Sequence, residues 1–473
     1  MYYRLKDKYF LRGWDKLPYA IVDSSTGNAR FLSPNVWQAV ELCDGSFDFS
    51  EPFVPDSLKQ IVSEEEKNGF IEKCNSGEGL NANQLYKKYP CRYINSVQWS
   101  ITGKCNYRCK HCYMSAPDVN AHQLPHDDIM HIIDQLAENG VMRVSITGGE
   151  PLIRDDFFDI VDALHQRNIV ITQIYSNGAL VTKKFLSELD KRNIHPAFIM
   201  SYDGTDGWHD WIRGVNGAGV LIDRAFSLCS DMGFHAMANM TLHQGNLHTL
   251  RDTINHLASM GVVSIKTAYA GNIGEWKTKN SGNAIDIKDV FQAYLDYIPH
   301  YYEDGMPIGI FLTSFFTTNP DNPDEYTIVG YNDTYNPEDT LLCGHARSSS
   351  YISPDGRPLM CGLLAGISLQ NNFPSLSDLS FAECISTPQY MNLIDMRASY
   401  FLKVNTTCGK CKFNKHCYGG CRGVALLEDE HNLMGTASSV CEMFYGGWIK
   451  KIVDTMKKVR PSAKCPVNDI TLL

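Results

Sequence analysis

Six short apolar runs alternate with helical patterns between Val97 and Ala270, and this alternation limits the possible folds more than any other feature. A repeated strand–helix unit is typical of a parallel sheet, because each helix returns the chain so that the next strand can run in the same direction. The predicted strands are Val97–Thr102, Arg143–Thr147, Ile169–Tyr175, Ala197–Tyr202, His235–Thr241 and Val263–Tyr269. The predicted helices are Asp127–Asn139, Phe157–Gln166, Lys183–Lys191, Val220–Met232 and Leu247–Met260. The sequence therefore predicts an α/β fold built from βα units.

Ten of the sixteen cysteines fall into two blocks, and the first block follows the first predicted strand. Cys105, Cys109 and Cys112 form a C-x3-C-x2-C triplet. Three thiolates on one loop can hold three irons of a [4Fe–4S] cube and leave the fourth iron open to a small chelating ligand. A lone triplet leaves a tetrahedral zinc site one ligand short, and the polar start of the chain, without an apolar signal segment, argues against disulfides. The triplet therefore favours a reactive iron–sulfur cluster.

The triplet and the motifs at the following strand ends resemble those of the radical S-adenosylmethionine (SAM) superfamily. Gly148-Gly149-Glu150-Pro151, Ser176-Asn177-Gly178 and Ser201-Tyr202-Asp203-Gly204 each end a predicted strand. In that superfamily SAM chelates the open iron, and its reductive cleavage yields a 5′-deoxyadenosyl radical that abstracts a substrate hydrogen. The resemblance implies a partial (β/α)6 TIM-type barrel with its site at the C-terminal strand ends. It makes the candidate SAM-binding residues Gly148, Gly149, Glu150, Ser176, Asn177, Ser201, Asp203 and Arg213.

Simpler interpretations of these motifs remain open. Asn-Gly and Asp-Gly pairs form turns in many proteins, and Arg213 could be a solvated surface charge. As a candidate SAM contact, Arg213 offers a guanidinium group suited to pairing with the SAM carboxylate.

The second block of cysteines resembles the SPASM extension of radical SAM enzymes. Its spacing is Cys343-x12-Gly356-x4-Cys361, then C-x2-C-x5-C-x3-C from Cys408 to Cys421, and then Cys441. The resemblance implies two auxiliary [4Fe–4S] clusters, although zinc is an alternative for part of the block. The ligands of the outer cluster would be Cys408, Cys411, Cys417 and Cys441. Those of the inner cluster would be Cys343, Cys361 and Cys421.

The inner group is one cysteine short of the set that some relatives carry, because residues 344–355 contain none. The open position would take water, a side chain such as Cys384, or a substrate thiolate, the kind of ligand that iron–sulfur iron prefers. Of these, a substrate thiolate would suit thioether formation.

The N-terminal residues 1–74 form a separate predicted domain. Tyr19–Val22 and Ala29–Leu32 flank a turn-rich segment and predict a hairpin, and Ser33-Pro34 predicts an N-cap and a first-turn proline. A second amphipathic helix carries Leu58 and Ile61. This order resembles the winged-helix-like leader-binding domain of peptide-modifying enzymes, which take an extended leader as an added strand. The alternative is a small fold that only shields the barrel.

The remaining boundaries follow from composition. Residues 75–92 are predicted to be a linker, 93–270 the radical SAM barrel, 271–340 a bridging region and 341–473 the SPASM domain. Within the bridging region we expect a helix near Ile287–Tyr302, an extended run near Ile308–Phe316 and a loop over Asn319–Asn336.

Composition narrows the choice of function. A net charge of −10 argues against nucleic acid as the main partner, and the chain lacks an uninterrupted apolar run long enough to span a membrane. Oxygen-sensitive clusters favour the reducing cytoplasm. The resemblance implies a radical SAM/SPASM maturase, similar to the sactisynthases, that forms thioether crosslinks in a ribosomally made precursor peptide. Its partners would be that peptide and a reductant such as flavodoxin or ferredoxin.

The same features allow other products. They include carbon–carbon crosslinks, epimerised residues and sulfatase-maturase-like dehydrogenation, and a zinc-binding leader-peptide scaffold is the alternative that is not an enzyme. No general base or hydrogen donor can be assigned from the sequence.

Overall fold

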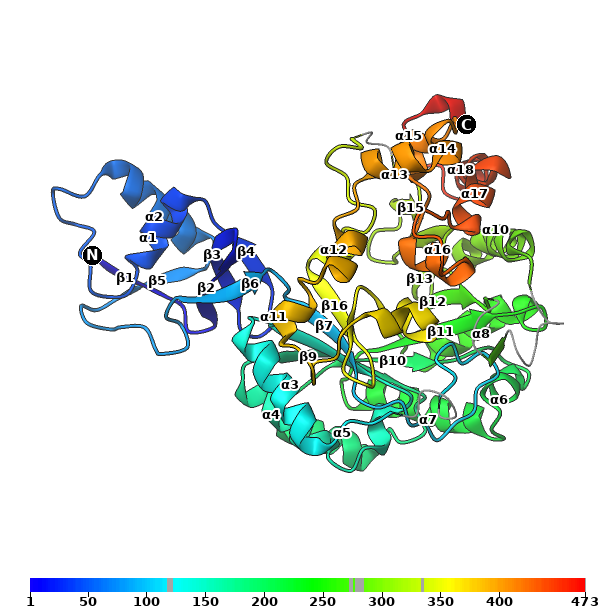
Figure 1. Cartoon of the computed structure of the whole chain (residues 1–473), viewed down its shortest axis with the longest axis horizontal. Helices are drawn as coiled ribbons and strands as arrows, with labels where there is room; N and C mark the ends of the chain where they lie inside the picture. Colours follow the sequence, from blue (N-terminus) through cyan, green and yellow to red (C-terminus); the bar gives the residue numbers. More distant parts are fainter. Residues whose placement is uncertain (117–121, 272–274, 277–284, 333–335, 473) are drawn as a thin grey trace.

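The computed structural model describes residues 1–116, 122–271, 275–276, 285–332 and 336–472. A small N-terminal lobe extends to one side of a larger body, and the C-terminal cysteine-rich region lies on the opposite side of the central sheet from helices α3 to α5 (Figure 1). No helix of the described residues is long and apolar enough to cross a bilayer.

The central sheet has eleven strands and confirms the predicted α/β fold class. Its strand order is β15-β14-β13-β12-β11-β10-β9-β8-β7-β16-β17, and β7 to β13 run parallel to one another. The six predicted strands are all present. They are β7 (Ser96–Ser100), β8 (Arg143–Thr147), β9 (Val170–Ser176), β10 (Ala197–Ser201), β11 (Ala236–Leu242) and β12 (Ser264–Tyr269).

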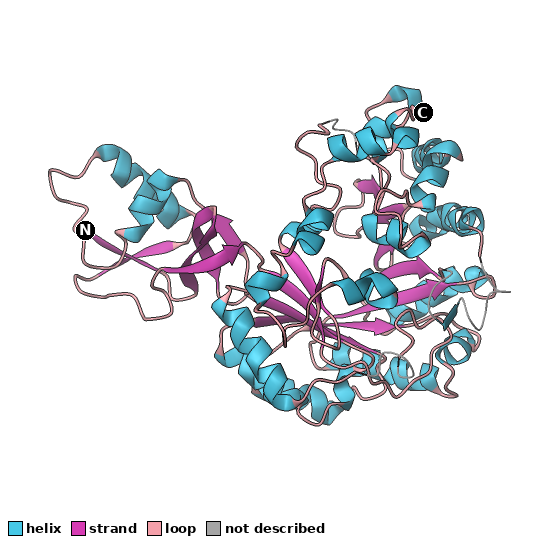
Figure 2. Ribbon diagram, viewed as in Figure 1, coloured by secondary structure: helices cyan, strands magenta, loops and turns pink. Residues whose placement is uncertain are grey.

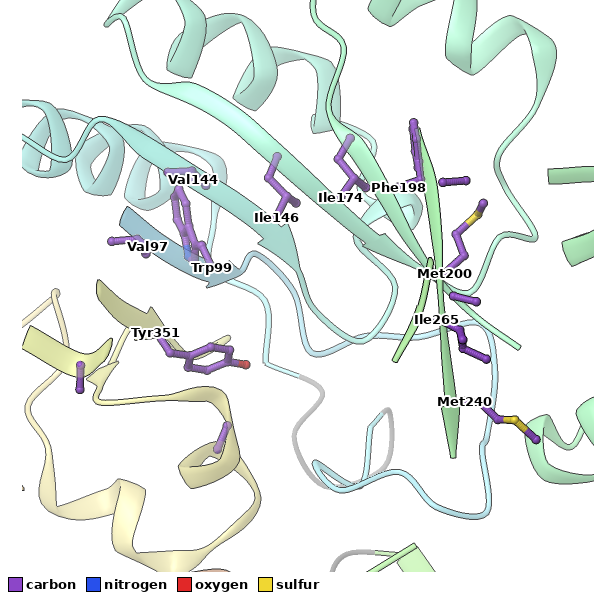
Figure 3. Packing of buried hydrophobic residues seen from close by; sticks show 14 of the residues in the cluster. Val97, Trp99, Val144, Ile146, Ile174, Phe198, Met200, Met240, Ile265 and Tyr351 are labelled. Carbon is purple, nitrogen blue, oxygen red and sulfur yellow. The ribbon is translucent and has the colours of Figure 1, made fainter. Parts of the chain in front are cut away.

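Helices cover the convex face of this sheet (Figure 2). They are α3 (His126–Glu138), α4 (Phe157–Gln166), α5 (Lys183–Lys191), α6 (Trp208–Arg213), α7 (Ala218–Asp231) and α8 (Leu250–Ser259), the last preceded by a 3-10 turn, η2 (Leu247–Thr249). Alternate strand residues are buried in the core, as Val144 and Ile146 show in Figure 3. Their neighbours Ser145 and Thr147 are half-buried on the concave face. That face is therefore polar and available for a site.

The bridging region is more than the predicted connection, because it extends the sheet. Helix α10 (Ile287–Glu303) occurs where a helix was expected. The extended run forms β13 (Gly309–Leu312), parallel to β12, and the start of β14 (Phe316–Thr318). The predicted loop contains β15 (Tyr326–Ile328). Residues 272–274, 277–284 and 333–335 of this region lie outside the described residues.

The N-terminal lobe confirms the predicted hairpin and two helices. The hairpin is β3 (Leu17–Asp23) with β4 (Ala29–Phe31), and the helices are α1 (Pro34–Glu41) and α2 (Asp56–Lys67). Ser33 occupies the N-cap position of α1 and Pro34 its first turn, as predicted, although the Ser33 side chain makes no capping hydrogen bond. Strands β1 (Tyr2–Leu5), β2 (Tyr9–Asp15) and β5 (Ile71–Cys74) were not predicted.

The predicted linker 75–92 is not wholly a linker. Its end forms β6 (Lys87–Arg92), which pairs in parallel with β2 and completes a sheet of order β4-β3-β2-β6. Tyr89 and Cys91 are buried in alternation with exposed Lys88 and Pro90. The polar residues and the proline hid this alternation in the sequence.

The C-terminal region adds β16 (Ser349–Ile352), parallel to β7, and β17 (Pro358–Leu359) to the sheet. Short 3-10 turns η5 (Gly362–Gly366) and η6 (Ser368–Asn372) follow. The remaining helices are α11 (Phe381–Cys384), α12 (Pro388–Ile394), α13 (Ala398–Val404), α14 (Thr406–Gly409), α15 (Asn414–Cys417), α16 (Arg422–Glu428), α17 (Ser438–Tyr445) and α18 (Trp448–Val459). Helix α18 packs against α10, which ties this region to the barrel.

Candidate functional site

A cavity of about 280 Å³ lies at the C-terminal ends of β8 to β11, beside the first cysteine loop. The C-terminal ends of parallel strands are where α/β barrels build their sites. Of the predicted site residues, those that line it are Cys105, Cys109, Cys112, Gly148, Gly149, Ser176, Asn177, Ser201 and Arg213. Glu150 and Asp203 do not line it, because both are fully buried behind it.

The two glycines allow the loop after β8 to pack on the cysteine loop. A Cβ at Gly148 would lie 2.5 Å from the Thr102 carbonyl oxygen, and one at Gly149 would lie 2.3 Å from that of Lys104. The Gly149 amide donates to the Thr102 carbonyl at 2.7 Å. The two glycines therefore allow a close approach between two backbone segments.

Glu150 holds two loops together. Its carboxylate accepts hydrogen bonds from the Asn177 amide at 2.7 Å, the Ser176 hydroxyl at 3.0 Å and the Leu152 amide at 3.1 Å. Burial raises the pKa of Glu150 to about 7, although these three donors oppose the rise. The Asn177 side chain in turn donates to Asn106 at 2.7 Å. Glu150 therefore positions the loop after β9 against the cysteine loop.

Asp203 supports Arg213 in the same indirect way. One carboxylate oxygen accepts from Arg213 Nε at 2.6 Å, and the other accepts from the Thr241 amide at 2.9 Å. Burial alone would raise the pKa of Asp203, but the guanidinium and His209 hold it far below its usual range. Arg213 Nη1 lies 3.6 Å from the sulfur of Cys109. The ion pair thus fixes a cation beside the cysteine triplet.

The three cysteines line the cavity, and two of their sulfur atoms accept hydrogen bonds from backbone amides. The Tyr107 amide donates to Cys105 Sγ at 3.4 Å, and the Ala116 amide donates to Cys112 Sγ at 3.3 Å. Burial, and to a lesser degree the Glu150 carboxylate and the neighbouring thiols, raises the pKa of Cys105 to about 12. A thiolate here therefore needs a bound cation, which iron would supply. The cavity and its three sulfurs fit an iron–sulfur cluster with one iron open.

Several lining residues were not predicted, namely Tyr107, His111, Tyr113, Tyr175, Asn239 and Thr241. Burial, followed by the Arg213 cation, lowers the pKa of His111 to about 3, so its ring is neutral. The buried Nδ1 of His111 has no hydrogen-bond partner among the described residues, which fits a ligand in this cavity. Asn239 and Thr241 alternate along β11, and this polar alternation was the available signal.

Some C-terminal cysteines lie near enough to one another for their thiols to affect each other's pKa. Burial, and then the thiols of Cys421 and Cys343, raise the pKa of Cys361 to about 12. In the outer group, burial followed by Cys411, Cys441 and Cys408 raises the pKa of Cys417 to about 11. In the described part of the chain, no three His, Cys, Asp or Glu side chains converge as a single metal ion requires.

Cys384 is not placed as a fourth ligand of the inner group. Its thiol is buried against the carbonyls of Pro374, Ser375 and Leu379. Helix α11, which carries it, packs against α3 and β6 instead of facing the concave side of the sheet.

Arg422 lies between the two groups of thiols. Its side chain is 3% exposed and donates to the carbonyls of Gly435 and Gly419 at 2.6 and 2.8 Å. Burial lowers the pKa of Arg422, while the thiols of Cys421 and Cys408, one from each group, raise it. No carboxylate of the described residues pairs with it, so the anionic sulfur sites are its natural counter-charge.

The inner group lies close to the first cavity. A Cβ at Gly366, five residues after Cys361, would meet the Tyr113 carbonyl oxygen at 2.6 Å. One at Gly362 would meet the ring of Tyr351 at 3.2 Å. The segment after Cys361 therefore packs directly on Tyr113, the residue that follows Cys112.

A second cavity, of about 310 Å³, shares Tyr175 with the first and includes Cys361. Polar side chains of the concave face line it, among them Gln98, Ser145 and Gln173. The Tyr175 hydroxyl donates to Gln173 at 3.2 Å, and Ser145 bonds the Thr172 hydroxyl at 3.1 Å. A group bound here would lie between the first cavity and the inner thiols.

The N-terminal lobe holds two sheets, β1-β5 and β4-β3-β2-β6, and the second has an edge that could accept another strand. Strand β4 is at that edge, and its Arg30 pairs with Glu65 of α2, Nη2 donating to Oε1 at 2.9 Å. The opposite edge, β6, is contacted by α11. An extended peptide would therefore pair with β4 beside α2.

Comparisons with known proteins agree with this site. The model of the Radical SAM superfamily matches residues 99–257, which hold the triplet and the strand-end motifs. The AdoMet-dependent heme synthase of Nitratidesulfovibrio vulgaris is 23% identical over 70% of this chain and 87% of its own. The radical SAM cyclopropyl synthase TigE of Paramaledivibacter caminithermalis is 23% identical over 85% of this chain and 84% of its own.

A solved structure resembles the whole arrangement. SuiB of Streptococcus suis, crystallised with its precursor peptide SuiA, superposes with a TM-score of 0.63 at 14% identity. The superposition covers 93% of this chain and all of SuiB. At this identity the similarity shows the fold, including the N-terminal lobe and the cysteine-rich region.

Proposed function

We propose that this chain, which is a radical SAM enzyme, modifies a ribosomally made precursor peptide held in the second cavity. The observation that carries the proposal is the pair of cavities that share Tyr175. A substrate in the second cavity would lie within reach of chemistry in the first and of the thiols around Cys361.

The first cavity would hold SAM and a [4Fe–4S] cluster on Cys105, Cys109 and Cys112. When bound, these groups supply the 5′-deoxyadenosyl radical of the superfamily. Arg213, fixed by Asp203, would pair with the SAM carboxylate. Gly148 and Gly149 would let the loop after β8 lie close to the cysteine loop. Ser201, Asn239 and Thr241 would offer hydroxyl and amide groups to the ribose.

Peptide delivery would use the N-terminal lobe. The leader would add a strand to β4, and main-chain hydrogen bonds would provide affinity. Binding the leader raises the effective concentration of the core segment at the barrel.

Thioether formation is the product that we favour. The inner group Cys343, Cys361 and Cys421 leaves room for a substrate thiolate, since Cys384 lies elsewhere. In the product one C–S bond replaces one C–H and one S–H bond, so two hydrogens are lost. Carbon–carbon crosslinking, epimerisation and dehydrogenation remain the alternatives. Two auxiliary clusters would bring iron to about twelve atoms per chain in a reducing compartment such as the cytoplasm.

Coexpression with a cysteine-bearing small open reading frame from the same locus tests the function. We expect a product two mass units lighter per crosslink, with one cysteine blocked from alkylation. The triple variant C105A/C109A/C112A is the control and should leave the peptide unmodified. A peptide that loses two hydrogens with every cysteine alkylable, or that gains a D-residue at unchanged mass, would exclude the thioether. Failure of every neighbouring peptide to be modified would contradict the wider proposal.

Deleting residues 1–92 tests the lobe. SAM cleavage without peptide should persist, because the triplet and its cavity lie in the barrel. Modification of full-length precursor should fall at least tenfold, within the range by which effective concentration raises avidity. Equal modification by the truncated and intact enzymes would show that the lobe does not deliver the leader.

A further inference from the structure

The outer cysteines lie in a basic stretch of an acidic chain. Between Asp395 and Glu428, residues 396–427 contain six lysines and arginines and no aspartate or glutamate. The chain as a whole has a net charge of −10. The share of lysine and arginine in residues 396–427 is higher than their share in the whole chain. Solubility alone does not explain this local excess of positive charge.

Three of these cations are exposed and form no ion pair within the described part of the chain. Lys403, Lys410 and Lys412 are exposed, and none forms an ion pair with another described residue. Lys410 and Lys412 flank Cys411 directly, and Lys412 lies 4.7 Å over the Phe413 ring. Lys415 differs, because it pairs with Asp469 at 3.0 Å.

An exposed aromatic side chain covers the same point. The hydroxyl of Tyr445 lies 3.3 Å from the sulfur of Cys411, and the residue is 65% exposed. Its ring contacts Phe413 with centroids 5.1 Å apart. Tyrosine surrounded by charged residues is a common centre of protein interfaces. We name the surface made by Lys410, Lys412 and Tyr445 the Cys411 face.

We propose that the Cys411 face is the docking surface for an acidic one-electron carrier protein, one that bears a flavin or an iron–sulfur cluster. The lysines would steer a negatively charged partner, and electrostatic complementarity mainly increases the association rate and the specificity. The interface would be small and transient, as is usual for electron-transfer encounters. The partner would seat its redox centre over Tyr445 and Cys411.

The electron count follows from the enzyme class. The reduced carrier loses one electron at each encounter, and reductive cleavage of one SAM molecule consumes one electron. The inference rests on the radical SAM assignment and not on the peptide substrate. Its test therefore needs no peptide, and its failure would leave the proposed function untouched.

The probe is a reduced, acidic flavodoxin, and the assay is SAM cleavage by the cluster-loaded enzyme. In K410E/K412E we expect the KM for flavodoxin to rise about tenfold at low salt, with the effect fading as ionic strength increases. Cleavage driven by dithionite, a small chemical reductant, should stay unchanged. The matched control is K183E/K184E on α5, which makes the same charge change at exposed residues of another face.

A second measurement does not depend on turnover. Zero-length carbodiimide crosslinking of wild-type enzyme to flavodoxin should join flavodoxin carboxylates to Lys410 or Lys412. Crosslinks confined to other faces, an unchanged KM in K410E/K412E, or an equal effect in K183E/K184E would each overturn the proposal. If dithionite-driven cleavage also falls in K410E/K412E, the wild-type crosslinking map decides. Self-association or oligonucleotide binding lost in K410E/K412E, with the flavodoxin KM unchanged, would assign the face to another copy or to nucleic acid instead.

Discussion

Replacing Asp203 by asparagine removes the counter-charge of a buried arginine. Asp203 is fully buried and Arg213 is 8% exposed, and the two are joined by a 2.6 Å hydrogen bond. An asparagine can still accept from the Thr241 amide, but its NH2 group would then face the Arg213 Nε donor. Breaking a buried ion pair from one side costs about 3–5 kcal/mol, because the remaining charge is left without compensation.

Urea unfolding of the metal-free chain at pH 7 measures this cost on the barrel transition. We expect D203N to lose about 3–5 kcal/mol. The matched control is D206N, because Asp206 is exposed and asparagine tolerates its positive φ of 57°. The double variant D203N/R213M should recover part of the loss, since it removes both charges.

The pH dependence gives a second test of the same pair. The pKa of Asp203 is lowered from its ordinary value of 3.8, so the stabilisation is present above that pH and is lost in more acidic solution. The difference between D203N and wild type should therefore shrink below about pH 4. A loss of less than about 1 kcal/mol in D203N at pH 7, with no recovery in the double variant, would refute the reasoning.

Three other predictions follow from the site. Because burial raises the pKa of Glu150 to about 7, its contribution to stability is present below its ordinary value of 4.5 and is lost as the pH rises through 7. E150Q should flatten the pH dependence of the melting temperature of the metal-free chain over this interval, and an unchanged slope would contradict the assignment. S145F should fill the second cavity and reduce peptide modification at least tenfold, while SAM cleavage stays unchanged. The control V220F, at a 73% exposed residue of α7, should change neither peptide modification nor SAM cleavage. Normal peptide modification by S145F would rule the cavity out as the substrate site. R422Q should lower the reduction potentials of the auxiliary sites by about 60 mV, which is a tenfold change in the equilibrium constant of a one-electron reduction. R422K, which keeps the positive charge, should restore the potentials in part. Spectroscopic redox titrations that give wild-type potentials for R422Q would exclude Arg422 as the counter-charge of these sites.

The elements that the sequence predicted are those with strong periodicity. Strand β8, Arg143–Thr147, matches its prediction because buried Val144 and Ile146 alternate with polar neighbours. Strand β16 was missed because two of its four residues, Ser349 and Ser350, are serines, although all four are buried in the sheet. Its position is set by pairing with β7, a contact between distant parts of the chain. Local sequence carries no record of that pairing.

Motif spacing located the site residues but not their orientation. The spacing of Cys105, Cys109 and Cys112 was sufficient to place the three cysteines on one loop. In the structure all three line the same cavity. The motifs could not tell that the carboxylates of Glu150 and Asp203 turn away from that cavity. Their direction depends on donors from other strands, such as the Asn177 and Thr241 amides.

The direction of those two carboxylates has a consequence for the chemistry of the first cavity. Had Glu150 and Asp203 faced it, two anions would have stood beside three thiolates and beside the carboxylate of SAM. Like charges within a few ångströms disfavour ionisation and would oppose both metal binding and SAM binding. Instead the carboxylates are used to hold loops, and of the charged side chains only Arg213 lines the cavity among the described residues, with a neutral His111. The buried carboxylates thus hold the loops and the Arg213 side chain in place. The Arg213 cation is the charge that three thiolates and the SAM carboxylate require nearby.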